Sequence, residues 1–166
     1  MIRRLVVFGA TGDLSARYLL PGLAALHAAG HLDGGFRLVG ADRSAWDSDR
    51  FRSWAAEQLD RHGAFLPAAD REAIVGAAEY RRTDATDPAD IGSAIAGDGP
   101  VAVYLALPPA LFPAVVNALH RAGLPPGSRI VLEKPFGEDF DRAAELNRLL
   151  ADLVPEQAEF RVDNFL

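Results

Sequence analysis

The sequence predicts an α/β domain built on a doubly wound, mostly parallel β-sheet. Strand and helix patterns alternate along the whole chain, as they do in βαβ units. Residues 101–107 form a nearly continuous apolar run, which is typical of a central parallel strand buried on both faces. With 166 residues, of which 49% are hydrophobic, the chain fits a single domain, residues 1–166, with a proper core.

The first half of the chain carries three strand patterns and three helix patterns. Residues 13–29 are expected to be helical because leucines recur at helical spacing and Gly30 is placed to end the helix. Pro21 lies inside this segment, so we expect a kink or a late start. The other elements expected here are strands over residues 4–8, 36–41 and 79–82, a helix from residue 48, and a short helix over residues 70–75.

The second half continues the alternation. Asp87 and Pro88 indicate a helix start, with proline at the first helical position, and Gly123 ends a helix over residues 111–122. The remaining elements expected are strands over residues 101–107, 129–132 and 159–162 and a long amphipathic helix over residues 139–153. Six strands with interleaved helices match a Rossmann-like dinucleotide-binding domain.

The most informative stretch is residues 6–14, where a short apolar strand runs into a glycine turn that opens a helix. Gly9 lets the backbone turn tightly, and Gly12 lets it approach a pyrophosphate at the positive end of that helix. Asp13 suits the first helical turn because of the helix dipole. The spacing is Gly-x-x-Gly rather than Gly-x-Gly-x-x-Gly, so a turn with a purely structural role is the alternative.

Asp42 and Arg43 follow the second predicted strand. Ligands of doubly wound sheets lie outside the carboxyl ends of the strands, so these residues are candidates for cofactor contacts. An aspartate at this place accepts from the ribose hydroxyls of NAD, whereas an arginine suits the additional phosphate of NADP. The sequence leaves the cofactor open between the two, and a solvated Asp-Arg pair is the alternative without function.

Two further strand ends carry candidate residues. Pro108 and Pro109 end the run over residues 101–107 and form a rigid edge that suits the nicotinamide side of a cleft. Lys134 precedes Pro135 just after the strand over residues 129–132, where it is placed to donate to a substrate hydroxyl or carbonyl oxygen. An exposed lysine without function is the alternative.

Composition narrows the classes of function. The formal net charge of -6, with no basic stripe among aromatic residues, argues against nucleic acid as a partner. The chain has no cysteine, which excludes disulfides and thiol catalysis and fits a cytoplasmic protein. No segment approaches membrane-spanning length, and no pair of histidines has metal-ligand spacing, so we expect neither a membrane nor a metal as a partner.

Four motifs, in order, resemble those of the glucose-6-phosphate dehydrogenase family. They are Gly-Ala-Thr-Gly-Asp-Leu at residues 9–14, residues 104–109, Glu-Lys-Pro-Phe-Gly at residues 133–137 and Arg-Val-Asp at residues 161–163. Their order and rough spacing agree over essentially the whole chain. The resemblance implies the N-terminal coenzyme-binding domain of a longer two-domain enzyme, and the alternative is that residues 160–166 are simply the last strand of a complete sheet.

In this family the C1 hydroxyl of glucose 6-phosphate is oxidised to a lactone while NADP, or in some members NAD, takes the hydride. The resemblance implies that Lys134 contacts both sugar and cofactor, directed by a cis Pro135, and that Asp163 orients a general-base histidine beyond this chain. Together with Lys134 and the candidates above, the implied cofactor contacts are Gly9, Ala10, Thr11, Gly12, Asp13, Leu14, Ser15, Ala16, Asp42, Arg43, Tyr104, Leu107, Pro108 and Pro135.

One departure from the family concerns the sugar phosphate. Where the family reads Arg-Ile-Asp-His-Tyr-Leu, residues 161–166 read Arg-Val-Asp-Asn-Phe-Leu. Asn164 can still contact the substrate through one hydrogen bond but carries no positive charge, and Phe165 has no hydroxyl. We expect phosphate affinity to fall by about 1.5–3 kcal/mol for each charged hydrogen bond removed, unless residues downstream compensate. A different or less phosphorylated sugar would also be consistent with this change.

We therefore predict an NADP-dependent sugar-phosphate dehydrogenase, with NAD also possible, in which this chain binds the coenzyme and is inactive by itself. Homo-oligomers would form only through a C-terminal domain. The alternatives are a sugar dehydrogenase of another two-domain family with Glu-Lys-Pro and a non-catalytic NAD(P)-sensing module. Phe136 and Gly137 speak against the first, and Lys134 and Asp163 against the second.

Overall fold

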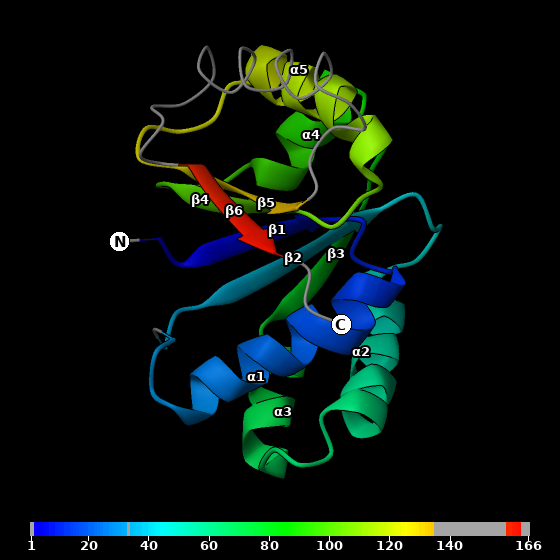
Figure 1. Cartoon of the computed structure of the whole chain (residues 1–166), viewed down its shortest axis with the longest axis vertical. Coiled ribbons are helices and arrows are strands. Elements are labelled where there is room, and N and C mark those ends of the chain that lie inside the picture. Colours follow the sequence, from blue (N-terminus) through cyan, green and yellow to red (C-terminus); the bar gives the residue numbers. More distant parts are fainter. Residues whose placement is uncertain (1, 33, 135–158, 164–166) are drawn as a thin grey trace.

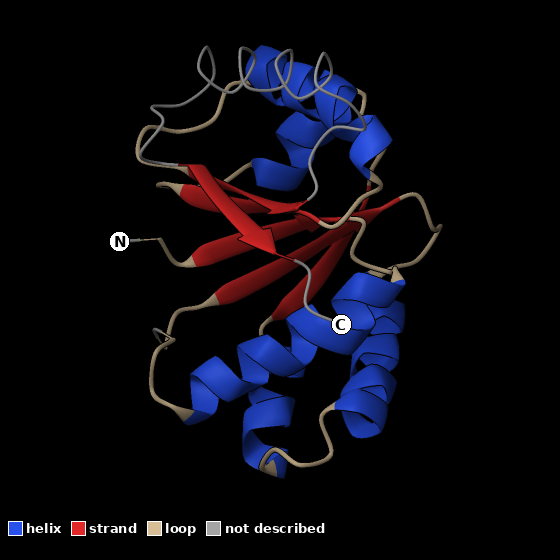
Figure 2. Cartoon of the chain, in the orientation of Figure 1, coloured by secondary structure: helices blue, strands red, loops and turns tan. Residues whose placement is uncertain are grey.

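The sheet has six parallel strands. The computed structural model of the chain describes residues 2–32, 34–134 and 159–163, and the strands follow the order β3-β2-β1-β4-β5-β6 (Figures 1 and 2). This order belongs to the doubly wound dinucleotide-binding fold, so the predicted fold class is confirmed. The strands are β1 (Arg4–Phe8), β2 (Arg37–Asp42), β3 (Ala78–Arg82), β4 (Val101–Leu105), β5 (Arg129–Lys134) and β6 (Glu159–Asp163).

The helices also lie where the periodicity predicted them. They are α1 (Leu20–Ala28), α2 (Ser48–His62), α3 (Ala68–Gly76), α4 (Pro88–Ile95) and α5 (Phe112–Ala122), with short helical turns η1 (Ser15–Leu19) and η2 (Pro109–Leu111). Asp87 caps α4 by accepting from the N–H of Ala89 at 3.0 Å, as its sequence indicated. The predicted helix over residues 139–153 lies outside the described residues. No helix in the described part of the chain is long and apolar enough to cross a membrane.

The disturbance expected at Pro21 takes the form of a wider helical turn. Residues 15–19 form a π-helix, in which the N–H of Leu20 donates to the carbonyl of Ser15, and α1 begins at Leu20. Proline has no N–H to donate to the preceding turn, so the regular ladder cannot continue through it. The segment therefore starts wide and tightens once Pro21 occupies the first turn of α1.

Each face of the sheet is covered by its own group of helices. In Figure 1, α4 and α5 lie on one side of the strands and α1, α2 and α3 on the other. Val6 and Phe8 of β1 belong to the core beneath α4 and α5, while Val7 belongs to the core beneath α1–α3. The alternation follows from the two-residue period of a strand. Because the strands are parallel, their carboxyl ends lie at one edge of the sheet.

One glycine in β2 permits close packing on the α2 side. A Cβ at Gly40 would lie 2.5 Å from the ring of Phe51, which is 1% exposed. The ring of Phe51 contacts the ring of Tyr80, with 5.4 Å between their centroids. The absence of a side chain at residue 40 thus lets an aromatic cluster press directly on the strand that leads into the candidate site.

Candidate functional site

A cavity of about 250 Å³ lies where the ends of four strands meet. Its walls come from the segments that follow β1, β2, β3 and β4 in turn. The lining residues are Gly9, Ala41, Asp42, Arg43, Thr83, Asp84, Ala85, Thr86, Leu107 and Leu111. A cavity at the carboxyl edge, between the two central strands β1 and β4 and their neighbours, is the usual place for a ligand of a doubly wound sheet.

Gly9 forms the tight turn at the end of β1. Its φ is +85°, and a Cβ there would lie 2.2 Å from the carbonyl oxygen of Ala106, so only glycine fits. The N–H of Gly9 donates to the carbonyl of Ala41 at 2.9 Å, which ties the turn to the end of β2. The predicted role of Gly9 as the residue that allows a close turn is therefore confirmed.

The helix that follows presents its N-terminus beside this turn. Gly12 donates to the carbonyl of Gly9 at 3.1 Å, and a Cβ on Gly12 would lie 3.3 Å from that oxygen. The first N–H groups of a helix have no partners within the helix and attract anions. Ser15 and Ala16 are buried beneath the turn, so their side chains support the helix start. Asp13 accepts from Nε of Arg17 at 2.7 Å.

Asp42 links the loop after β2 to the glycine turn. Its Oδ2 accepts from the N–H of Thr11 at 3.0 Å and from the Thr11 hydroxyl at 2.7 Å. Its Oδ1 accepts from the N–H of Arg43 at 2.8 Å. The carboxylate predicted to meet a ribose thus faces the protein, and it fixes the two loops relative to one another.

Arg43 extends from the same loop toward solvent. Its side chain is 75% exposed, and its Nη2 lies 3.4 Å from Oδ1 of Asp84. Asp84 also accepts from the N–H and the hydroxyl of Thr86, at 2.9 and 2.7 Å. These bonds from Thr86, followed by the charge of Arg43, lower the pKa of Asp84 and so favour its charged form.

Tyr80 of β3 supports the loop after β2 from below. Its hydroxyl donates to the carbonyls of Asp42 and Ser44, at 2.9 and 2.7 Å. Burial, followed by the nearby charge of Asp42, raises the pKa of Tyr80 to about 12, so the phenol keeps its proton under ordinary conditions. The sequence analysis did not single out Tyr80.

The segment after β3 was also missed. Thr83 and Asp84 follow directly on that strand and line the cavity, yet the sequence analysis interpreted only Asp87, as a helix start. The signal was available, because the rule that carboxyl ends bind ligands applies to the third strand as well. The two arginines that end β3 give this strand a less apolar pattern than its neighbours.

The candidate residues in and after β4 differ in whether they line the cavity. Leu107 lines the cavity, whereas Pro108 is exposed beside it and its carbonyl accepts from the N–H of Leu111 at 2.9 Å. The contacts predicted between these two residues and the cofactor stay predictions. Tyr104 packs against the core on the α1–α3 side and is not among the lining residues. Its contact with the cofactor stays a prediction.

Lys134 and Asp163 are brought together by the backbone. They end β5 and β6 and are opposite each other in the parallel register. Two residues that lie 29 positions apart in sequence therefore share the same edge of the sheet as the cavity. Pro135 and Asn164, the other two residues expected near the sugar, lie outside the described residues.

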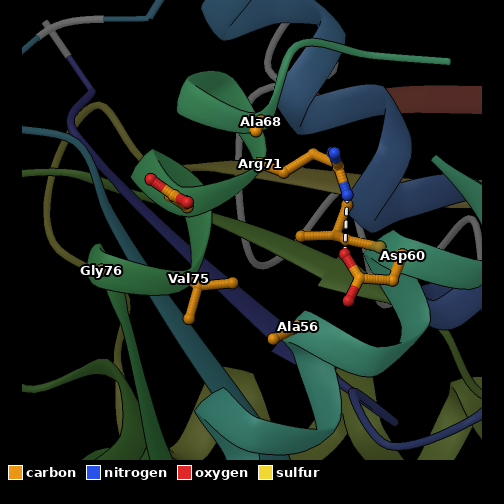
Figure 3. Close-up of a pocket in the computed structure, with 8 residues that line it drawn as sticks. Ala56, Asp60, Ala68, Arg71, Val75 and Gly76 are labelled. Atoms are coloured by element: carbon orange, nitrogen blue, oxygen red, sulfur yellow. Dashed lines mark hydrogen bonds and ion pairs between the residues drawn. The ribbon is translucent and has the colours of Figure 1, made fainter. Parts of the chain in front are cut away.

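A second hollow, of about 380 Å³, lies between α2 and α3, away from the strand ends (Figure 3). Arg71 spans it, with its Nη1 2.6 Å from Asp60 and its Nε donating to the carbonyl of Leu66 at 3.2 Å. The hollow is otherwise lined largely by apolar helical side chains such as Val75. None of the residues predicted from the sequence as site residues lies here.

The geometry at the carboxyl edge fits a dinucleotide. A glycine turn that a Cβ would fill stands beside a helix N-terminus, which suits a pyrophosphate. The adjoining cavity combines apolar walls at Leu107 and Leu111 with the exposed guanidinium of Arg43. The fold and this site are those of an α/β dinucleotide-binding domain.

Comparison with known proteins identifies the family. Residues 6–166 match the model of "Glucose-6-phosphate dehydrogenase, NAD binding domain". The chain is 37% identical to glucose-6-phosphate 1-dehydrogenase of Zymomonas mobilis, over 99% of this chain and 36% of that protein. It is 34% identical to glucose-6-phosphate 1-dehydrogenase 2 of Mycobacterium tuberculosis, over 98% of this chain and 35% of that protein.

Solved structures agree with this result. Glucose-6-phosphate 1-dehydrogenase from Mycobacterium avium superposes with a TM-score of 0.84 at 30% identity, over 97% of this chain and 35% of that one. The chain therefore belongs to the glucose-6-phosphate dehydrogenase family, as its motifs indicated, and it corresponds to the NAD-binding domain. It spans about a third of the length of the relatives that it matches.

Proposed function

We propose that this chain forms the coenzyme-binding part of an NADP-dependent dehydrogenase that oxidises glucose 6-phosphate at C1. The observation that carries the proposal is the position of Arg43, whose exposed guanidinium stands at the cavity beside the glycine turn. The neighbouring Asp42 carboxylate faces Thr11 instead. Relatives that cover nearly the whole chain are named glucose-6-phosphate 1-dehydrogenase.

The chain's own residues would bind and orient the coenzyme. Residues 9–14 present the helix N-terminus to the pyrophosphate, and Arg43 donates to the 2′-phosphate. Leu107 and Leu111 supply apolar walls for the adenosine. When bound, NADP supplies the nicotinamide ring that accepts a hydride from the sugar. NAD is the alternative cofactor, and it would rely on Asp42 rather than Arg43.

The sugar side of the reaction would fall to Lys134 and Asp163. Their opposed positions at the ends of β5 and β6 support this assignment. Lys134 would contact the sugar and the cofactor, and Asp163 would orient a general base supplied by the rest of the enzyme. The remaining length of the relatives would provide that base, the substrate domain and any subunit interface, so we expect the isolated chain to bind nucleotide without turnover.

Calorimetric titration with NADP and with NAD, at one fixed ionic strength, tests the proposal. We expect tighter binding of NADP in the wild type and loss of that preference in Arg43→Ala, by about tenfold or more if a charged hydrogen bond is removed. Arg17→Ala is the matched control, because Arg17 is exposed and paired with Asp13 on the surface of η1. A preference for NAD that Asp42→Ala removes would transfer the role to Asp42.

A further inference from the structure

A third hollow, the outer hollow, adjoins the cavity at the ends of β2 and β3. It has a volume of about 530 Å³ and is lined by Arg43, Arg82, Thr83, Asp84 and Asp90. Three of these residues, Arg43, Thr83 and Asp84, also line the cavity, so the two hollows adjoin each other at these side chains. An anionic group held by Arg43 would therefore lie beside both the cavity and this outer hollow.

The charges in the outer hollow balance only when Arg82 is counted. Asp84 is paired with Arg43, and Asp90 accepts from the N–H of Asp84 at 2.9 Å. Two carboxylates thus face one guanidinium if Arg82 is left out, and a doubly negative phosphate would be repelled. The Thr86 bonds to Asp84 lower the pKa of that carboxyl further below its ordinary value, so both carboxylates are charged when a phosphate approaches.

Arg82 stands at the place where a second cation is needed. It is the last residue of β3 and the register partner of Asp42, at the end of β2. Its side chain is exposed and makes no ion pair within the described part of the chain. The preceding residue, Arg81, lines neither hollow, because successive side chains of a strand point to opposite faces.

We propose that Arg82 is a second ligand of the 2′-phosphate of NADP and a specificity-determining residue of this domain. The proposal rests on the proposed function, since it assumes that a dinucleotide occupies the cavity. Arg43 would turn part of its hydrogen bonding from Asp84 to the phosphate, and Arg82 would approach the same phosphate from the end of β3. Two guanidiniums around a dianion offset the carboxylates of Asp84 and Asp90.

The test compares Arg82→Gln with Arg81→Gln by calorimetric titration of the full chain with NADP and with NAD. Both variants lose one positive charge from adjacent positions of β3, so a general change in net charge affects them equally. We expect Arg82→Gln to weaken NADP binding roughly five- to twentyfold, with NAD binding changed less than about twofold. Arg81→Gln should leave both affinities within about twofold, and Arg82→Lys should restore part of the NADP affinity.

Salt provides a second readout. The loss in Arg82→Gln should shrink as ionic strength rises, because contacts between exposed charges are screened. Equal losses in the two glutamine variants, or equal weakening of NADP and NAD in Arg82→Gln, would overturn the role of Arg82. If NADP binding depends on Arg43 but not on Arg82, only this inference fails. If the wild type binds neither nucleotide, the proposed function fails with it.

Discussion

The two cavities that differ most in this domain are the one at the strand ends and the one between α2 and α3. The walls of the first come from the ends of four strands and the segments that follow them, and those of the second come from residues of the two packed helices α2 and α3. The helical cavity is the larger of these two, at about 380 against 250 Å³. Volume therefore does not identify the site, whereas the meeting of loops that carry a glycine turn, a guanidinium and several carboxylates does.

The two cavities also differ in the hydrogen bonds that hold their walls in place, which are more numerous at the carboxyl-edge cavity. Around it, hydrogen bonds between 2.7 and 3.0 Å join the loops after β1 and β2 to each other, through Gly9 and Asp42, and to strand β3, through Tyr80. At the helical cavity, Arg71 makes the polar connections, to Asp60 and to the carbonyl of Leu66. Rigid placement of donors is what a binding site requires, so substitutions at the two cavities should have different consequences.

The largest expected difference concerns glycine. Gly9→Ala should destabilise the domain by at least about 2 kcal/mol, because its φ is +85° and the new Cβ would collide with the carbonyl of Ala106. Gly76→Ala, beside the helical cavity, meets nothing within 4 Å at the end of α3 and should be neutral or slightly stabilising. Urea unfolding measures both changes. Similar stabilities of the two variants would show that the turn at Gly9 relaxes easily.

The glycine turn was predictable because its signal is local. An apolar strand, two glycines and a helix start lie within nine residues. The start of α4 is likewise indicated by two adjacent residues, Asp87 and Pro88. Strand alternation and leucine spacing fixed most element boundaries to within one or two residues. The order of the strands then follows from general rules for doubly wound sheets.

The contacts between loops had no such signal. Asp42 bonds Thr11 across 31 positions, and Tyr80 reaches Asp42 across 38. Neither the residue types nor their spacing distinguishes these pairs from a solvated aspartate and a core tyrosine. Which donor an aspartate finds is decided only when the loops have been placed side by side by the sheet.

An effect of intermediate size should distinguish residues that hold the binding-site loop in place from residues that only stabilise the packing of α2 and α3. Tyr80→Phe removes the hydroxyl beneath the Arg43 loop and should cost about 1–2 kcal/mol of stability, together with a loss of NADP affinity. Arg71→Ala should also lower stability, since it frees α3 from Asp60 and from the carbonyl of Leu66, but nucleotide affinity should not change. Urea unfolding and NADP titration of both variants decide the matter. If Tyr80→Phe binds NADP as tightly as the wild type, the position of the Arg43 loop does not depend on the Tyr80 hydroxyl.

The smallest effect should appear at alkaline pH. The pKa of Tyr80 is raised by burial and by the Asp42 charge, from the ordinary value of 10.0 to about 12 in the folded chain. A raised pKa means that the folded state holds the proton more firmly than the unfolded state, so the stabilisation is complete below pH 10 and is lost as pH rises from 10 to 12. The gap in unfolding free energy between the wild type and Tyr80→Phe should therefore narrow by less than about 1 kcal/mol by pH 10.5. If this difference in unfolding free energy stays constant from pH 8 to pH 10.5, the pKa of Tyr80 is not raised in the folded state. The contribution of its hydroxyl to the loop would then not depend on a raised pKa.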